Sequence, residues 1–150
     1  MAANLEKMIG ITRSSNVQIL LETHDDWLCS NHLKAVMEKV DSTYAGILWD
    51  VHHPYRMKGE TPAETWATLG PWIKNTHWKD SRSAPESERG YQLCLFGNGD
   101  IPLKEIFNCL KNDGYNECLT LEWEKAWNPE IEEPEIAFPG FVKVMRQLMQ

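Results

Sequence analysis

The feature that most restricts the fold of this chain is an alternation of short apolar runs with amphipathic stretches of helical spacing. Such a unit recurs every roughly 28 residues, which predicts parallel strands joined by covering helices. Four apolar runs are expected to be strands: residues 17–22, 44–50, 73–80 and 117–124. The predicted order therefore alternates helix and strand, and it begins and ends with a helix.

Several residues at the ends of the expected helices have the chemistry of helix caps. Thr61 followed by Pro62 predicts one helix start, and Ser30 or Asn31 is expected to cap another. Gly114 is typical of a helix stop, and Pro139 is expected to begin or kink the last helix. The polar, Gly-rich stretch 81–102 is predicted to be a long loop with one short strand at 91–96.

The charge and length of the chain restrict its partners. The formal net charge is −7, which opposes binding to nucleic acid or to an anionic membrane surface. No apolar run approaches the roughly 20 residues that span a bilayer, and residues 1–10 lack the pattern of a signal peptide. The four cysteines show no C-x-x-C spacing, so reduced thiols and a cytoplasmic location are expected. One domain, residues 1–150, is predicted.

Each expected strand has an ionisable side chain at its carboxyl end. These side chains are Glu22, Asp50, His77 and Glu122. Because parallel α/β proteins bind ligands at the carboxyl ends of their strands, the four groups are expected to converge. Three carboxylates and one imidazole suit Mn²⁺, Mg²⁺, Co²⁺ or Zn²⁺, and they leave positions open for substrate oxygens.

A structural explanation also exists for each of these residues on its own. One carboxylate at the end of a strand commonly caps the next helix or meets solvent. Four such groups on four strands, with a histidine among them, favour a functional site. His24 lies two residues after Glu22 and shares its face, so a place in the ligand pocket and a hydrogen-bonded structural role are both open. For His52, a supporting or solvated role and a role as a metal ligand are both open.

At these residues the chain resembles the xylose-isomerase-like TIM barrel superfamily, and within it the sugar isomerase and epimerase branch. The similar segments, in chain order, are LLETH, ILWDVHHP, THWKD, GNGDIP and LTLEWE. The resemblance implies that Glu22, Asp50, His77 and Glu122 hold one divalent ion, with Mn²⁺ as the expected metal. It also implies that Glu22 and Glu122 are the catalytic acid/base pair.

The resemblance further implies contacts between the protein and its substrate. His53, three residues after the aspartate, is expected to touch the substrate, and Arg82 is the nearest candidate for a basic residue that follows the metal histidine. His24 is a third candidate for substrate binding. The implied substrate is a small sugar or sugar phosphate.

The implied fold is half of a (β/α)₈ TIM barrel, with four parallel strands and covering helices that correspond to the last four β/α units. Half a barrel leaves two open sheet edges and an uncovered inner face, because closure with a packed interior takes about eight strands. We therefore expect a homodimer that completes the barrel or covers the inner face. Leu20, Ile47 and Trp49 are expected to need such cover.

The predicted function is that of an isomerase or epimerase in carbohydrate metabolism. It would move a proton next to a ketose carbonyl through an enediolate, and a keto-polyol dehydratase would share that first step. One alternative is a non-catalytic half-barrel, or a fragment, that acts in binding or assembly. A DNA repair nuclease of the endonuclease-IV type is a second alternative, but residues 87–99 lack the histidine that it needs, and the acidic charge opposes it.

Overall fold

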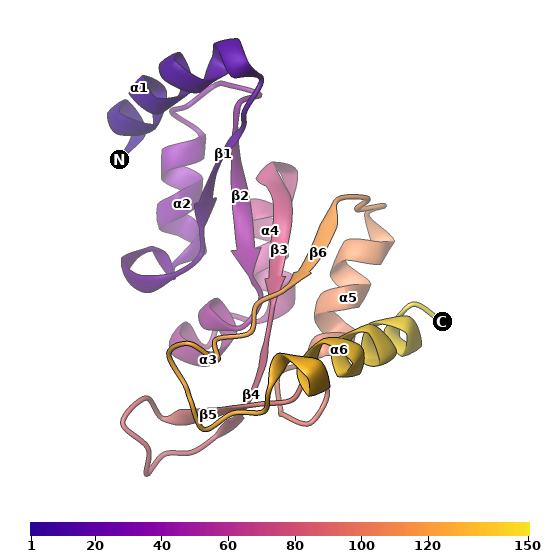
Figure 1. The fold of residues 1–150 in the computed structure, drawn as a ribbon. Coiled ribbons are helices and arrows are strands. Elements are labelled where there is room, and N and C mark those ends of the chain that lie inside the picture. Colours follow the sequence, from indigo (N-terminus) through magenta and orange to yellow (C-terminus); the bar gives the residue numbers. More distant parts are fainter.

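The computed structural model describes residues 1–150, and its centre is a curved sheet of four parallel strands (Figure 1). In their order across the sheet the strands are β1 (Ile19–Glu22), β2 (Ala45–Asp50), β3 (Ile73–Trp78) and β6 (Cys118–Leu121). Neighbouring strands pair in parallel throughout, which confirms the predicted half of a TIM barrel. Because β1 and β6 are the outer strands, each has one edge without a strand partner.

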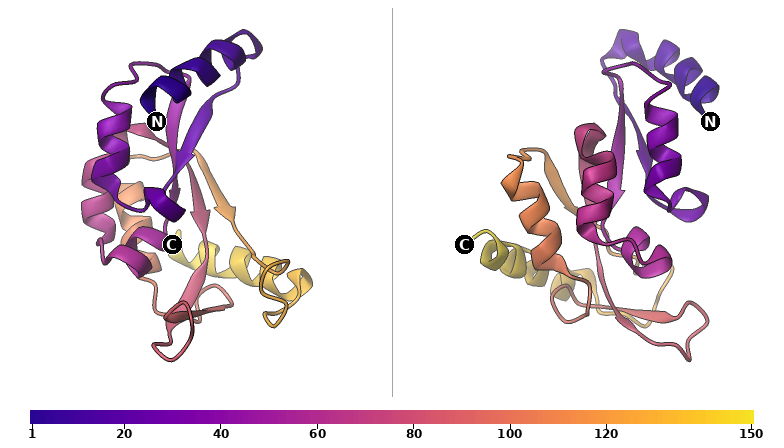
Figure 2. Two further views of the ribbon diagram at one scale, coloured as in Figure 1. Left: turned by 90° about the vertical axis from the view of Figure 1, so that its left-hand side faces the viewer. Right: turned by 180° about the vertical axis from the view of Figure 1, so that it is seen from behind.

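The helices that connect the strands lie on one face of the sheet, as the side view in Figure 2 shows. They are α2 (Ser30–Met37), α4 (Pro62–Leu69) and α5 (Leu103–Asn112). α1 (Ala2–Thr12) precedes the sheet, and α6 (Pro134–Leu148) ends the chain beside α5 (Figure 1). The remaining helices are short: η1 (Arg13–Ser15), η2 (Asp25–Trp27), α3 (His53–Lys58) and η3 (Gly70–Trp72). None of the helices is long and apolar enough to cross a membrane.

The hydrophobic core lies between the sheet and these helices. Ile47, Trp49 and Trp78 point into it and are almost completely buried. The expectation that Ile47 and Trp49 need cover on the inner face is therefore wrong, because alternation along β2 directs both toward the helices. Leu20 and Leu48 are only partly buried.

The helix ends are only partly as expected. Thr61 caps α4 and Pro62 is at its first position, as predicted, and Glu64 completes a capping box with Thr61. α2 has no side-chain cap from Ser30 or Asn31; the Ser30 amide instead donates to the Glu60 carboxylate at 3.0 Å. α6 begins at Pro134, and Pro139 lies inside it.

The predicted long loop contains an antiparallel hairpin at the carboxyl end of the sheet. Its strands are β4 (Asp80–Ser83) and β5 (Tyr91–Cys94). The Asp80 carboxylate accepts hydrogen bonds from the amides of Gly97 and Gly99, both at 2.9 Å, and so ties the Gly-x-Gly loop to the start of β4. This hairpin stands beside the strand ends where the sequence places its polar residues (Figure 1).

Candidate functional site

The strand ends bring the predicted site residues to one edge of the sheet. Asp50 and His77 end adjacent strands and are partners in the register of β2 and β3. Glu22 is the last residue of β1. Glu122 follows β6, and its amide donates to the Trp78 carbonyl at 2.9 Å, which continues the pairing of β3 with β6 by one residue.

Glu22, His77 and Glu122 form one compact group. Nδ1 of His77 lies 2.9 Å from Oε1 of Glu22 and 3.6 Å from Oε2 of Glu122. The possible ligand atoms of the three side chains all lie within 4.8 Å of one another. Hydrogen bonding to Glu122 and Glu22 raises the pKa of His77 to about 9. The three groups are partly exposed, so a ligand can reach them.

Asp50 is completely buried and belongs to a neighbouring group. Its Oδ1 accepts from the backbone amides of His52 and His53, at 2.9 and 3.1 Å, and so opens α3. Its Oδ2 lies 2.7 Å from Nδ1 of His53. Burial alone would raise the pKa of Asp50, but the hydrogen bond from His53 and the charge of Lys79 hold it well below its usual range.

Lys79 connects the two groups, and it was not among the residues that the sequence singled out. Its Nζ lies 2.9 Å from Asp50, 2.6 Å from Glu122 and 2.8 Å from Glu124. Burial would lower the pKa of this lysine, but the charges of Asp50 and Glu122 raise it well above its usual value. The sequence does contain a signal for it, because Lys79 is two residues after His77 and residues two apart in a strand share a face.

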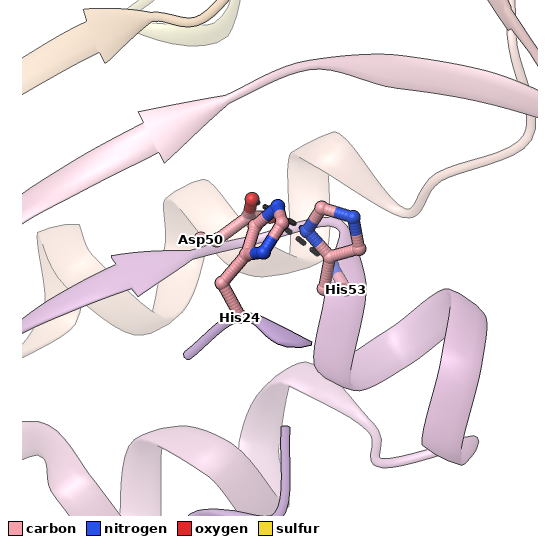
Figure 3. A group of neighbouring side chains, drawn as sticks. All are labelled: His24, Asp50 and His53. Atoms are coloured by element: carbon pink, nitrogen blue, oxygen red, sulfur yellow. Dashed lines mark hydrogen bonds and ion pairs between the residues drawn. The ribbon is translucent and has the colours of Figure 1, made fainter. Parts of the chain in front are cut away.

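His24 and His53 stand together beside Asp50 (Figure 3). Their ring centroids are 4.0 Å apart in an edge-to-face arrangement. Both line a cavity of about 660 Å³ whose wall also includes Arg89 and Tyr91. Arg82 is not part of that wall, because it lies on β4 and its Nε donates to the Asn98 carbonyl at 2.8 Å. Arg89 is thus the arginine that reaches the cavity.

His52 is a buried neighbour of His53. It is fully buried, and its Nε2 lies 2.8 Å from Oγ of Ser81, which also accepts a hydrogen bond from Nε of Arg56 at 3.1 Å. Burial lowers the pKa of His52 to about 3, so its ring is neutral at pH 7. The ring packs edge to face against His53, with centroids 4.9 Å apart, and therefore fixes the position of His53.

The donor set of the first group fits a divalent metal ion. Two carboxylates and one imidazole are ligands that Mn²⁺, Co²⁺ and Zn²⁺ accept. Asp50 lies next to them, with both of its oxygens already accepting hydrogen bonds from protein donors. The structure thus brings Glu22, His77 and Glu122 together and joins Asp50 to them through the ammonium group of Lys79.

Comparison with known proteins agrees with this geometry. Residues 1–139 match the family model described as xylose isomerase-like TIM barrel. A curated relative, the uncharacterized protein YihM of Escherichia coli strain K12, is 27% identical over 105 residues, which cover 67% of this chain and 32% of YihM. The chain thus spans about a third of the length of this relative.

Solved structures show the same fold. A xylose isomerase domain protein from Planctomyces limnophilus superposes with a TM-score of 0.77 and 22% identity, and the match covers 98% of this chain and 50% of that protein. A D-tagatose 3-epimerase-like protein gives a TM-score of 0.76 with 20% identity, covering 99% of this chain and 52% of that protein. Further similar structures are sugar epimerases. The chain therefore corresponds to about half of each barrel.

Proposed function

Because the chain belongs to the xylose isomerase-like TIM barrel family, we propose that it provides the metal-binding and proton-transferring half of a sugar isomerase or epimerase. The observation that carries this proposal is the placement of Glu22 and Glu122 against the same nitrogen of His77, at 2.9 and 3.6 Å, at the carboxyl edge of the sheet. In this fold that edge is where the chemistry takes place.

The proposed ligands of the metal are Glu22, Asp50, His77 and Glu122, and Mn²⁺ is the proposed ion. The group around His77 supports three of these ligands, Glu22, His77 and Glu122, while Asp50 lies in the neighbouring group with His24 and His53. When bound, a divalent ion would act as a Lewis acid that polarises the carbonyl of a ketose and makes the neighbouring C–H group more acidic. The amides at the start of α3 fix Asp50, and the ion would have to displace the ammonium group of Lys79 from its Oδ2.

The proposed acid/base pair is Glu22 and Glu122. They project from the ends of different strands, β1 and β6, with His77 between them. A substrate bound over His77 would therefore have one carboxylate on each side. One removes the carbon-bound proton, and the other returns a proton to the opposite face in an epimerisation or to the next carbon in an isomerisation.

Lys79 would keep Glu122 in the form that can accept a proton. Burial tends to raise the pKa of Glu122, but His77 and Lys79 outweigh it, so the pKa is lower than usual. The proposed substrate contacts are His53 and His24, because both face the cavity. Arg89, rather than Arg82, is in position for the third contact.

Metal binding is the most direct test of this function. The protein is expected to bind about one Mn²⁺ per chain, and His77→Ala is expected to weaken binding by at least about 100-fold, because losing only an outer partner of a ligand costs roughly 10–100-fold. Isothermal titration calorimetry with Mn²⁺, followed by elemental analysis, measures both. His32→Ala is the matched control, since His32 is exposed on α2 and should leave the affinity unchanged. Equal affinities in wild type and His77→Ala would remove His77 from the site.

We further propose that a second copy of the chain completes the barrel. Both β1 and β6 present an unpaired edge, and the helices next to these edges expose large apolar side chains. On α1 these are Met8 and Ile11, and on α6 they include Ile136, Phe138 and Val142. In a two-fold pair, β1 of one copy would meet β6 of its partner twice, which closes a barrel of about eight strands.

Sedimentation equilibrium at micromolar concentration is expected to give twice the mass of the chain. Phe138→Glu should shift the protein toward monomer, because it places a charge on an apolar contact. Ala67→Glu, an exposed apolar position on α4, which connects the two inner strands β2 and β3, is the control and should leave the dimer intact. A stable wild-type monomer at this concentration would refute the proposed assembly.

A further inference from the structure

The cavity lined by His24 and His53 is acidic. Its wall contains the carboxylates of Asp25, Glu88 and Glu124 and one guanidinium group, that of Arg89. A second cavity of about 290 Å³ next to it shares His24, Glu124 and Trp127 and adds Glu122. A phosphate group on a substrate carries nearly two negative charges at neutral pH, so this wall would repel it.

The basic side chains of the loops after β3 and β6 are already engaged within the protein. Lys79 is enclosed by three carboxylates, and Arg82 donates to the Asn98 carbonyl. Nη1 of Arg89 donates to Oδ1 of Asn128 at 3.2 Å. Nζ of Lys125 donates to two backbone carbonyls and pairs with Glu133. Of these cations only Arg89 reaches the cavity, and Asn128 holds its Nη1.

The backbone amides of the Gly-x-Gly loop are also occupied. In TIM barrels a phosphate is frequently held by the loops after the last two strands, through backbone N–H groups. Here the Asp80 carboxylate accepts from the amides of Gly97, Gly99 and Ile101 in the Gly-x-Gly loop. The other two amides of the loop donate to backbone carbonyls: Asn98 to Leu95, and Asp100 to Ser81. An internal carboxylate thus takes the place that an external anion would need.

The rest of the cavity wall suits an uncharged polyol. Trp127 is 80% exposed and lines both cavities, so its ring face is free to stack against the C–H face of a sugar. Leu28 and Met57 add apolar surface. The carboxylates of Glu88 and Glu124 are good acceptors for sugar hydroxyl groups.

We propose that the site takes an unphosphorylated ketose and discriminates against sugar phosphates, and that Trp127 is the platform on which the sugar stacks. This inference rests on the proposed isomerase or epimerase function and specifies its substrate class. It follows from the three carboxylates of the cavity, the engaged cations around it and the closure of the loop amides by Asp80.

The test compares matched pairs of substrates. The full chain with Mn²⁺ is incubated in D₂O with D-fructose or D-fructose 6-phosphate, and with D-ribulose or D-ribulose 5-phosphate. Incorporation of deuterium at carbon is followed by mass spectrometry. Within each pair, kcat/KM is expected to be at least about ten-fold higher for the unphosphorylated sugar, because like-charge juxtaposition disfavours the phosphate. Saturation-transfer NMR of the same four compounds reports binding without turnover.

The outcomes distinguish a failure of the proposed substrate class from a failure of the proposed isomerase or epimerase function. Faster exchange with the sugar phosphates would overturn the inference and leave the isomerase or epimerase function standing. Exchange with none of the four compounds, together with no saturation transfer, would count against both. Trp127→Ala is expected to raise KM for the free sugar about ten-fold, or about 1.4 kcal/mol, with little change in kcat, because the ring that binds the sugar is lost while the glutamates are untouched. Met149→Ala, an exposed apolar side chain just after α6 that lines neither cavity, should not change KM, and an unchanged KM in Trp127→Ala would refute the platform.

Discussion

Glu122→Gln is expected to reduce the exchange of a carbon-bound ketose proton with solvent by more than the roughly 10²–10⁴-fold credited to one general base. The amide of glutamine cannot accept the proton, and the loss of a charged ligand also weakens metal binding. The amide oxygen can still accept from Lys79, whose Nζ lies 2.6 Å from Glu122, so the fold should be retained. Deuterium incorporation in D₂O, with a sugar that the wild-type protein turns over, measures the effect.

Glu105→Gln is the control for this substitution. Glu105 is exposed in the first turn of α5 and forms none of the ion pairs of the site, so its replacement removes the same charge without touching the site. The control should keep the wild-type rate, and both variants should keep the wild-type melting temperature. If Glu122→Gln turned over substrate as fast as the control, Glu122 would have no part in proton transfer.

Gly99→Ala is expected to lower the free energy of unfolding by about 3 kcal/mol, which is the upper part of the range for overpacking a filled site. A Cβ atom on Gly99 would overlap the Asp80 carboxylate and the Ser81 carbonyl oxygen. The carboxylate cannot move away without giving up its hydrogen bonds to Gly97 and Gly99. Because these bonds hold the Gly-x-Gly loop against β4, their loss should also loosen the hairpin of β4 and β5. Urea denaturation followed by tryptophan fluorescence gives the change.

Gly140→Ala is expected to raise the free energy of unfolding, although the chemical change is the same. Gly140 lies inside α6, and no atom lies within 4 Å of the position that its Cβ would occupy. Alanine at a helix interior is favoured over glycine, so this variant should gain about 0.5–1 kcal/mol. Equal urea midpoints for Gly99→Ala and the wild type would show that the loop can give way at no cost and that Asp80 does not hold it.

Much of the site could be predicted from local patterns. An apolar run with a charged or imidazole side chain at its end predicts both the strand and the edge on which that side chain lies, because parallel strands present all their carboxyl ends together. Glu22, Asp50, His77 and Glu122 are found at that edge, at the ends of the four paired strands. Their binding of a metal stays a prediction, as does the role of Glu22 and Glu122 as an acid/base pair.

Features that are encoded within a few neighbouring residues follow from the amino-acid sequence alone. Alternation along each strand, the helical spacing between strands and the capping box of Thr61 and Glu64 each depend on residues only a few positions apart. The physical reason is that the dihedral angles of one element fix the direction of its side chains, whatever the rest of the chain does. The half-barrel and the edge that carries its site follow from repeating such elements.

Which distant side chains meet depends on the packing of the whole chain. Lys79 contacts Glu122 across 43 residues of sequence, Glu60 receives the Ser30 amide across 30, and Asp80 closes the Gly-x-Gly loop. These contacts depend on how the strands and loops pack in space, and on the requirement that a buried charge find a partner wherever packing places one. No local pattern encodes that choice, which is why the sequence located the strand ends but missed the lysine between them.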